Sequence, residues 1–239
     1  MQRFNPTAGA TRQPSLLVAV KTMTTFNSGS TRARLVVCAL GLLAGACSVA
    51  GPAPTPPATQ LFQLCAQCHG EGALGNQHVN APSIAGLPAW YIEGQLKNFK
   101  TGGRGTHFDD LTGMQMRPMA LSLETDDEIK TIAAYVAAMP ATKPAPVLSG
   151  GDANRGKTLF AVCVACHQAD ASGNQALKAP PLTHASDWYM ASSLKKFKAG
   201  IRGTNPKDQG GALMRPMSQT LTDDQAVADV VAYIVTLQK

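Results

Sequence analysis

The clearest pattern of apolar and polar positions lies in two segments, TDDEIKTIAAYVAAM and TDDQAVADVVAYIV, which begin at Thr125 and Thr222. Apolar residues recur there at spacings of three and four, the period of one helix face: Ile129, Ile132, Ala133 and Val136 in the first segment, and Val227, Val230, Val231 and Ile234 in the second. Three residues after each threonine stands Glu128 or Gln225, which is typical of a capped helix start. No segment alternates apolar and polar residues over the length of a strand, so we predict an all-α fold.

A third apolar segment, LVVCALGLLAGA, has a different character. It follows Arg32 and Arg34 and precedes small residues and the proline-rich GPAPTPPA. This three-part pattern predicts a secretory signal in residues 1–50, with cleavage after Ala50, translation starting at Met23 and a periplasmic location. The run is too short to span a membrane. The alternative is a lipoprotein signal in which Cys47 is acylated and associates the protein with a membrane.

Composition excludes one class of partner. The chain has 239 residues and a formal net charge of +6. Residues 1–50 hold five basic and no acidic residues, so the remainder has 16 Lys and Arg against 15 Asp and Glu. Because the excess basic charge lies in the predicted signal, we expect no nucleic-acid partner.

The chain repeats itself at an offset of 98 residues. From Leu61 to Tyr135, against Leu159 to Tyr233, 31 of 75 ungapped pairs are identical. This predicts two tandem domains, at 51–140 and 151–239, joined by a proline-rich linker at 141–150 that acts as a semi-rigid spacer. Each domain is expected to hold a short helix, a helix near 88–100 or its equivalent, a glycine-rich loop containing MRPM, and a closing helix.

The motif CxxCH occurs once in each repeat, at Cys65, Cys68 and His69 and at Cys163, Cys166 and His167. Cysteines three apart on a helix share a face with the adjacent histidine. Two thiols can form thioethers with haem vinyl groups while the imidazole binds the iron, so we predict two covalently bound haem c groups. The alternatives are zinc, which needs a second ligand pair that neither repeat supplies nearby, a redox dithiol, and a plain disulfide.

Two methionines in each repeat are candidates for the second axial ligand. Met116 and Met214 lie 47 residues beyond their histidines, and Met119 and Met217 lie 50 beyond. Methionine ordinarily fills cores, but paired methionines at the same spacing after CxxCH favour iron ligation. The spacing alone admits either pair.

The double pattern CxxCH, AP, WY, LK.FK, RGT, MRPM and AAY resembles the dihaem cytochrome c4 family over residues 60–239. The resemblance implies two tandem cytochrome c-like domains, Met116 and Met214 as ligands, and Met119 and Met217 as packing neighbours. It implies that the carbonyl groups of Pro82 and Pro180 accept hydrogen bonds from the ligand histidines. The first repeat lacks the GDANRGKTLF that leads into the second, so its first helix is expected to be shorter or less well packed.

Other residues carry weaker signals. Arg104 and Arg202 are candidates to pair with haem propionates, because guanidinium groups match carboxylate geometry, or are solvated loop residues. Trp90, Tyr91, Trp188 and Tyr189 are expected to pack in the domains. The remaining histidines, His78, His107 and His184, have no histidine at the repeat offset and are expected on the surface.

Iron held by His and Met on both sides has no open position for substrate, which favours electron transfer over catalysis. We therefore expect a non-enzymatic carrier that takes electrons from a quinol-oxidising complex and passes them to a terminal oxidase, partners that the family resemblance implies. The alternatives are a haem subunit of a dehydrogenase complex, such as a flavoprotein sulfide dehydrogenase, and a dihaem peroxidase. The similarity of the two repeats argues against a peroxidase.

Overall fold

The computed structural model describes residues 54–238. The predicted signal peptide, the start at Met23 and the acylation of Cys47 lie outside the described residues and stay predictions. Within the described part, no helix is long and apolar enough to cross a membrane.

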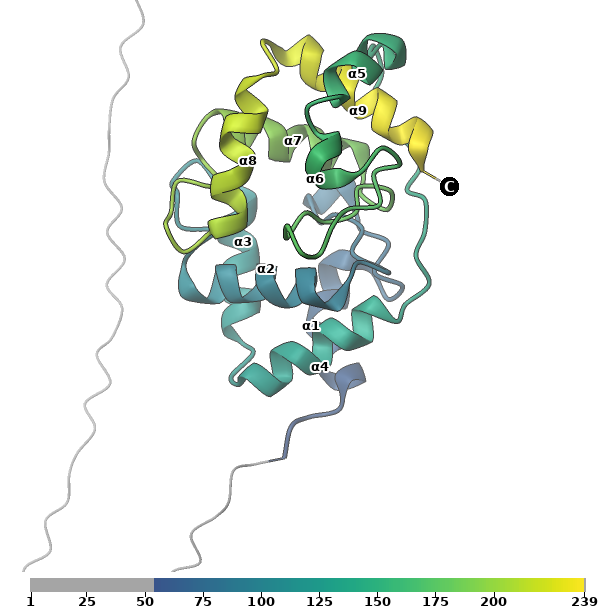
Figure 1. Ribbon diagram of the computed structural model, residues 1–239. Coiled ribbons are helices and arrows are strands. Elements are labelled where there is room, and N and C mark those ends of the chain that lie inside the picture. Colours follow the sequence, from purple (N-terminus) through teal and green to yellow (C-terminus); the bar gives the residue numbers. More distant parts are fainter. Residues whose placement is uncertain (1–53, 239) are drawn as a thin grey trace, which may run out of the picture. The chain divides into compact units, whose positions relative to one another are not determined.

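Helices make up both repeats (Figure 1). Lobe 1, residues 54–140, contains α1 (Ala58–His69), the short 3-10 helix η1 (Gln77–Val79), α2 (Ala89–Thr101), α3 (Leu111–Leu121) and α4 (Asp126–Ala137). Lobe 2, residues 151–238, contains α5 (Ala153–Phe160), α6 (Val164–His167), α7 (Asp187–Lys198), α8 (Gln209–Gln219) and α9 (Asp224–Leu237). Between residues 54 and 238 the only β-type pairings are isolated bridges, one in each lobe. The predicted all-α class is confirmed.

Each lobe has its own hydrophobic core. One cluster of buried side chains lies within lobe 1 and a separate one within lobe 2. The rings of Phe62 and Tyr135 lie 5.5 Å apart at 58° in lobe 1, and those of Phe160 and Tyr233 have the same separation and angle in lobe 2. The 98-residue sequence repeat is therefore also a repeat of side-chain packing.

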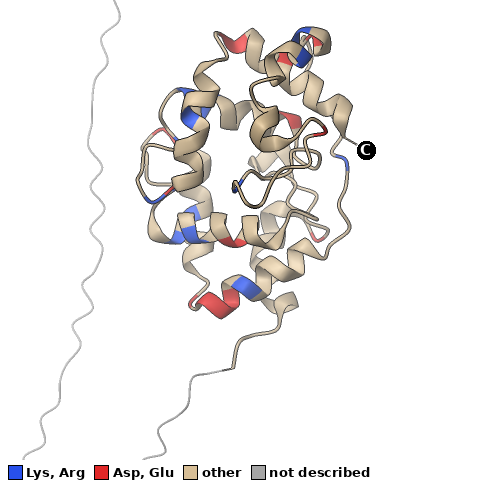
Figure 2. Ribbon diagram, in the orientation of Figure 1, with Lys and Arg blue, Asp and Glu red and all other residues tan. Residues whose placement is uncertain are grey.

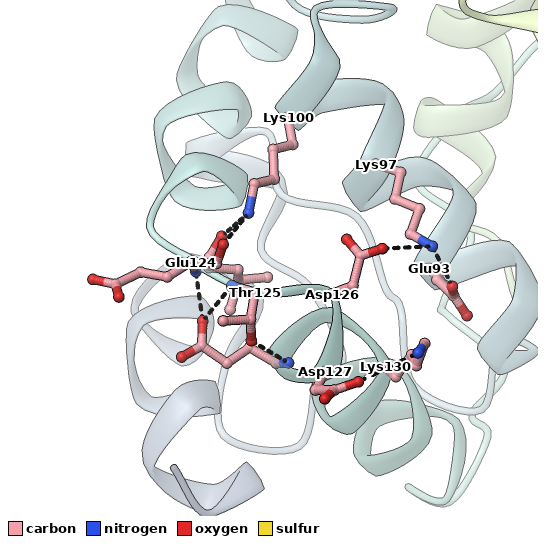
Figure 3. Close-up of polar contacts among 10 residues, drawn as sticks. Glu93, Lys97, Lys100, Glu124, Thr125, Asp126, Asp127 and Lys130 are labelled. Carbon is pink, nitrogen blue, oxygen red and sulfur yellow. Dashed lines mark hydrogen bonds and ion pairs between the residues drawn. The ribbon is translucent and has the colours of Figure 1, made fainter. Parts of the chain in front are cut away.

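The closing helices begin at equivalent positions of the two lobes. In α4, Thr125, labelled in Figure 3, forms the predicted capping box with Glu128. The first turn of α4 is acidic, red in Figure 2. In α9 the predicted cap, Thr222, is wrong: Asp223 caps the helix and accepts a hydrogen bond from the Ala226 backbone N–H. Asp caps a helix as well as Thr does, and Asp223 lies 98 residues from Thr125, so the repeat register decides the start.

The MRPM segments are helical, which corrects the prediction of a glycine-rich loop. They lie inside α3 and α8, and Pro118 and Pro216 are interior residues of these helices. A proline removes one backbone hydrogen bond, to the carbonyl four residues earlier, but does not by itself end a helix. Asp110 and Asp208 start the helices by accepting hydrogen bonds from the backbone N–H groups of Gly113 and Gly211.

A lysine near the end of α2 and of its lobe 2 equivalent, α7, binds the segment that precedes the closing helix. Lys100 donates to the carbonyl oxygens of Leu123 and Glu124, and Lys198 donates to that of Leu221. Figure 3 shows the contact between Lys100 and Glu124. Nearby, Lys97 pairs with Glu93 at 2.6 Å and Asp126 at 3.7 Å. These contacts fix α2 against the start of α4.

The first helices of the two lobes differ, and of the expectation that the lobe 1 helix is shorter or less well packed, the second half is confirmed. α1 is not shorter than α5, because it continues unbroken through the CxxCH motif, whereas lobe 2 divides the same path into α5 and α6. What lobe 2 adds is polar anchoring and close packing. Asp229 of α9 accepts hydrogen bonds from the Asp152 N–H at 2.8 Å and from Arg155. A Cβ atom at Gly156 would lie 1.9 Å from the Asp229 carbonyl oxygen, so α5 lies directly on α9.

The linker is fastened at both of its ends. Ala141 packs on Gly86 of lobe 1, where a Cβ atom would lie 2.4 Å from that of Ala141. The backbone N–H groups of Val147 and Leu148 each donate to the Asp187 carboxylate at 2.7 Å. The prolines and these anchors together hold the connection between the lobes.

Candidate functional site

The histidine of each CxxCH motif ends a helix and is held in one orientation. His69 is 7% exposed and His167 is 5% exposed. Nδ1 of His69 lies 2.8 Å from the carbonyl oxygen of Pro82, and Nδ1 of His167 lies 2.9 Å from that of Pro180. A carbonyl oxygen only accepts, so Nδ1 carries the proton and Nε2 is left with its lone pair for a metal ion. This is the arrangement that orients an axial histidine and tunes its basicity.

Both imidazoles are held in the form that binds metal. Burial lowers the pKa of His69, and the hydrogen bond to Pro82 opposes that effect only in part. His167 and Pro180 show the same balance. The neutral ring is the ligand form of histidine, so the site is prepared for ligation in both lobes.

A tight loop places the proline carbonyl groups. Gly75 and Gly173 have φ of +84° and +79°, in the region that favours glycine. A Cβ atom at Gly75 would lie 2.5 Å from the carbonyl carbon of Pro82, and one at Gly173 would lie 2.6 Å from that of Pro180. The backbone at each proline therefore packs directly against the glycine, and only glycine fits there.

The four cysteines of the two motifs are free thiols in the structure. Cys65 and Cys163 are half-buried, whereas Cys68 and Cys166 are exposed. Burial raises the pKa of Cys65, and it raises that of Cys163 to about 11. Among residues 54–238, no group of three or more His, Cys, Asp or Glu side chains is placed to hold a metal ion, so the zinc alternative gains no support.

The first methionine of each pair lies on the inward face of its helix. Met116 follows the buried Gly113 by three residues and precedes the buried Ala120 by four, and it packs against the lobe 1 core together with Cys65. In lobe 2 the equivalent half-buried residue is Met214, whereas Met217 is 38% exposed. These positions favour Met116 and Met214 as the ligands, which remain a prediction.

Four of the described arginines each have one buried nitrogen atom without a hydrogen-bond partner. In the described part of the chain, the Nε atoms of Arg104, Arg117, Arg202 and Arg215 are buried without a hydrogen-bond partner. Arg104 and Arg202 lie over the rings of Phe99 and Phe197, each 4.3 Å from the ring centroid. Nη1 of Arg104 and Nη1 of Arg202 donate to the neutral side chains of Gln95 and Ser193, and a buried charged group left with an unpaired donor is costly. Two haem groups would bring four propionates, so this set of residues fits haem.

Sequence reasoning named Arg104 and Arg202 but missed the other two arginines. Arg117 and Arg215 lie within the repeated MRPM segments, next to the predicted ligands Met116 and Met214. Their identity at the repeat offset was the available signal. The predicted surface positions of His107 and His184 are wrong, because both residues are half-buried, whereas His78 is exposed as predicted.

The aromatic pairs pack as expected but also reach across the lobes. Trp90 and Tyr91 contact edge to face at 5.8 Å, and Trp188 and Tyr189 do so at 6.1 Å. Tyr91 packs on the lobe 1 core, and burial raises its pKa to about 12. Tyr189 belongs to lobe 2, yet Arg104 of lobe 1 lies close enough to favour its phenolate. Arg104 therefore lies near the boundary of the two lobes.

Comparison with known proteins agrees with this geometry. The family model for cytochrome c matches residues 57–140 and 153–238. The chain is 32% identical over 180 residues to the thiosulfate dehydrogenase electron acceptor of Stutzerimonas stutzeri, covering 71% of this chain and 78% of that protein. It is 31% identical over 189 residues to cytochrome c4 of Thiocapsa roseopersicina, covering 74% and 88%. The structure of Acidithiobacillus ferrooxidans cytochrome c4 superposes with a TM-score of 0.61 at 26% identity, covering 73% of this chain and 99% of that one.

Two lobes that each present CxxCH, an oriented histidine and a half-buried methionine define a dihaem electron-transfer protein with two covalently bound haem c groups. The chain belongs to the cytochrome c family and, within it, to the dihaem cytochrome c4 group.

Proposed function

We propose that this dihaem cytochrome works in the periplasm as a carrier that collects electrons from a donor complex and delivers them to a terminal oxidase. The observation that carries the proposal is the equivalence of the two sites. His69 and His167 have the same burial, tautomer and hydrogen-bond partner, and Met116 and Met214 occupy the same helix position. Two like sites suit a relay better than the division of labour that a peroxidase requires.

When bound, haem with His and Met ligands supplies a six-coordinate iron that exchanges one electron at a moderately high potential. The protein contributes orientation and charge. The carbonyl groups of Pro82 and Pro180 keep Nε2 of each histidine available as a ligand. The buried arginines provide the positive charge that the propionates need, and the lobe cores keep water from the apolar side of each site.

The relatives support the classes of partner. One is named an electron acceptor of thiosulfate dehydrogenase, which favours a dehydrogenase as donor beside the quinol-oxidising complex. The CcoP subunit of a cbb3-type cytochrome c oxidase in Rubrivivax gelatinosus is 34% identical over half of this chain, which favours a cytochrome c oxidase as the acceptor. Export rests on the apolar segment before residue 51, which precedes the described residues.

Carbon monoxide binding to the reduced holoprotein tests the absence of an open coordination position. We expect no change in the visible spectrum, because both methionines hold their places. Met116→Ala and Met214→Ala provide the matched positive controls, since each should open one site and bind carbon monoxide at half of the haem. Rapid binding by the unchanged protein would contradict the carrier and support an enzymatic reading.

The donor is tested by mixing oxidised protein with purified thiosulfate dehydrogenase and thiosulfate, or with a quinol-oxidising complex and quinol, and following haem reduction by stopped-flow absorbance. Reduction by one donor and fast reoxidation by a terminal oxidase is the expected result. Failure of both donors to reduce a protein that dithionite reduces would contradict the proposed partners.

A further inference from the structure

One side of α3 in lobe 1 carries a row of exposed apolar side chains. The exposed residues on this side of the helix are Leu111, Met114, Pro118 and Leu121. Leu111 is 68% exposed, and Met114 and Leu121 are 46% and 44% exposed. Residues three and four apart are neighbours on a helix, so the four side chains form one continuous line. Phe108, just before α3, is 77% exposed, and we call these five residues the outer stripe.

The outer stripe lies on the side of α3 that faces away from the predicted haem site. An α-helix has about 3.6 residues per turn, which places Met116 roughly opposite Met114 and Pro118. Gly113 and Ala120, on the Met116 side, are buried, and Met116 packs against the lobe 1 core. A haem bound through Met116 would therefore leave the stripe exposed to water, and the cofactor does not explain this apolar surface.

Lobe 2 shows that a methionine helix forms without such a stripe. The equivalent residues of α8 and of the segment before it, each 98 positions later, are all exposed: Pro206, Gln209, Ala212, Pro216 and Gln219. α8 nevertheless begins with the same aspartate cap and carries the equivalent methionine. Single exposed apolar residues are ordinary, but a contiguous group marks an interaction surface. The apolar residues of the stripe therefore point to a contact outside lobe 1.

Both ends of the outer stripe are acidic. Asp109 lies at its beginning with a side chain that is 54% exposed, and the exposed Glu124 follows its end. Nδ1 of His107 accepts a hydrogen bond from the Asp109 backbone N–H at 3.2 Å, so the ring is neutral and does not offset Asp109. Lys100 binds the Glu124 carbonyl oxygen, whereas the Glu124 carboxylate points away from Lys100 in Figure 3. The equivalent residues of lobe 2 are Lys207 and Thr222.

Charge and size indicate which kind of partner fits the stripe. Two copies of this chain paired through it would bring acidic ends together, whichever way the two helices run, and like charges oppose such a pair. A stable dimer also takes about 20–30 residues from each partner, whereas the stripe has five. An anionic membrane attracts basic rather than acidic residues. A small apolar surface with charge at its rim is typical of the brief contacts that redox proteins make.

We propose that the outer stripe is the surface on which a redox partner docks to lobe 1, and that this partner offers an apolar surface with Lys or Arg at its rim. The inference rests on the proposed function, because a carrier must bind its partners and release them. Burial of the stripe would hold the complex, and Asp109 and Glu124 would steer the approach. A docked partner is separated from Met116 by the width of α3, and one electron passes between the partner's redox centre and the lobe 1 iron, so that one is oxidised as the other is reduced.

Lobe 2 supplies substitutions that remove the stripe and keep the helix. A triple variant, Leu111→Gln with Met114→Ala and Leu121→Gln, gives α3 the residues that α8 carries at the same positions. Leu213→Gln is the matched control, because Leu213 is 64% exposed on α8 and lies outside the stripe, and lobe 1 has glutamine at its equivalent position. A charge variant, Asp109→Lys with Glu124→Thr, replaces the acidic ends with the lobe 2 residues.

Stopped-flow absorbance of each holoprotein, at low and high ionic strength, measures reduction by thiosulfate dehydrogenase or by a quinol-oxidising complex, and reoxidation by a terminal oxidase. We expect the triple variant to react about tenfold more slowly than the unchanged protein with at least one of these partners, and Leu213→Gln to stay within about twofold. The charge variant should react more slowly at low ionic strength and depend less on salt. Haem content and the absence of carbon monoxide binding should be the same in every variant.

Equal rates for the triple variant and the unchanged protein with every partner would overturn this inference and leave the proposed function in place. If the triple variant yields no holoprotein, the charge variant decides, since it leaves α3 unchanged, and a rate and salt dependence equal to those of the unchanged protein would overturn the inference. Failure of both donors to reduce the unchanged protein contradicts the proposed function and this inference together.

Two further measurements test the other occupants of the stripe. A dimer of the unchanged holoprotein in analytical ultracentrifugation that the triple variant does not form would assign the stripe to a second copy. Sedimentation with phosphatidylglycerol vesicles that the triple variant loses would assign it to a membrane surface. Either result overturns the proposal, and we expect a monomer that stays in the supernatant.

Discussion

Lobe 1 and lobe 2 hold the same candidate haem-binding residues in the same geometry, yet they differ at their first helices and at the boundary between them. The oriented histidine, the glycine behind the proline carbonyl, the inward methionine and the buried arginines occur in both. The lead-in to α5 and the charges at the lobe boundary do not match. The comparison indicates that haem binding constrains the shared features, while the differences adapt each lobe to its place in the chain.

The largest expected effect concerns the loop, present in both lobes, that places the proline carbonyl group beside the histidine. Gly75→Ala and Gly173→Ala each place a methyl group about 2.5 Å from backbone atoms at a positive φ, so the proline carbonyl must move away from the histidine. We expect a loss of about 3 kcal/mol of unfolding free energy in either lobe. Thermal unfolding of the holoprotein, followed by circular dichroism and haem absorbance, measures it.

Gly70→Ala is the control for that change, because its φ is +77° but no atom lies within 4 Å of the added methyl group. It should cost about 1 kcal/mol, from backbone strain alone. An equal cost at Gly70 and Gly75 would show that the contact with Pro82 is unimportant. Unequal costs at Gly75 and Gly173 would break the equivalence of the lobes.

The next effect is confined to lobe 2. Gly156→Ala would drive a methyl group into the backbone of Asp229, and we expect a loss of about 2 kcal/mol, as for other overpacked contacts. Gly94→Ala, inside α2 of lobe 1 with open space around it, should be neutral or slightly stabilising. Chemical denaturation of both variants provides the comparison, and a neutral Gly156→Ala would contradict the close α5–α9 packing.

The stability of lobe 2 in acid should also depend on the contacts of Asp229 with Asp152 and Arg155. The hydrogen bond from Arg155 is the main cause that holds the pKa of the Asp229 carboxyl well below its usual range, against the effect of burial. Since the native pKa is lower than the unfolded value of about 4, this carboxylate stabilises the fold above that pH, and the contribution is lost as the pH falls. Asp229→Asn should cost about 1–2 kcal/mol at neutral pH and flatten the loss of stability below pH of about 4.

Melting temperatures measured from neutral pH down to acid test this prediction. Asp224→Asn removes an exposed carboxylate from the same helix and should leave the pH dependence nearly unchanged. An acid profile of Asp229→Asn that parallels that of the unchanged protein would rule out the anchor as a source of pH sensitivity.

The smallest effect again concerns a shared feature. Lys100→Met and Lys198→Met each remove the donor to the carbonyl groups before the closing helix while keeping most of the apolar stem. We expect losses of about 1 kcal/mol that are equal in the two lobes, measured by urea unfolding. Lys130→Met, which breaks only an exposed pair with Asp127, is the control and should cost less than about 0.5 kcal/mol.

Much of the molecule was predictable because its signals are local or repeated. The helical period around Ile129 and Val230 is a property of neighbouring residues, and CxxCH brings its ligands together within one turn of helix. The repeat then argued against a chance arrangement of these residues, because the spacing from His69 to Met116 equals the spacing from His167 to Met214.

The errors arose where local rules compete. Proline and glycine in the MRPM segments suggested loops, but Asp110 and Asp208 cap helices that tolerate an interior proline. Thr222 and Asp223 are both good caps, and the structure uses the second, which stands at the repeat position of Thr125.

The sequence by itself determined the class of fold and the two covalently bound haem groups, because covalent attachment needs particular residue types at short, fixed spacings. Only the tertiary structure decided which residues cross between the lobes. Lys196 and Asp110 are 86 residues apart, and Asn98 and Asp208 are 110 apart. No local pattern predicts such contacts, since the interactions that hold them exist only once both lobes have folded and water has been removed from the boundary.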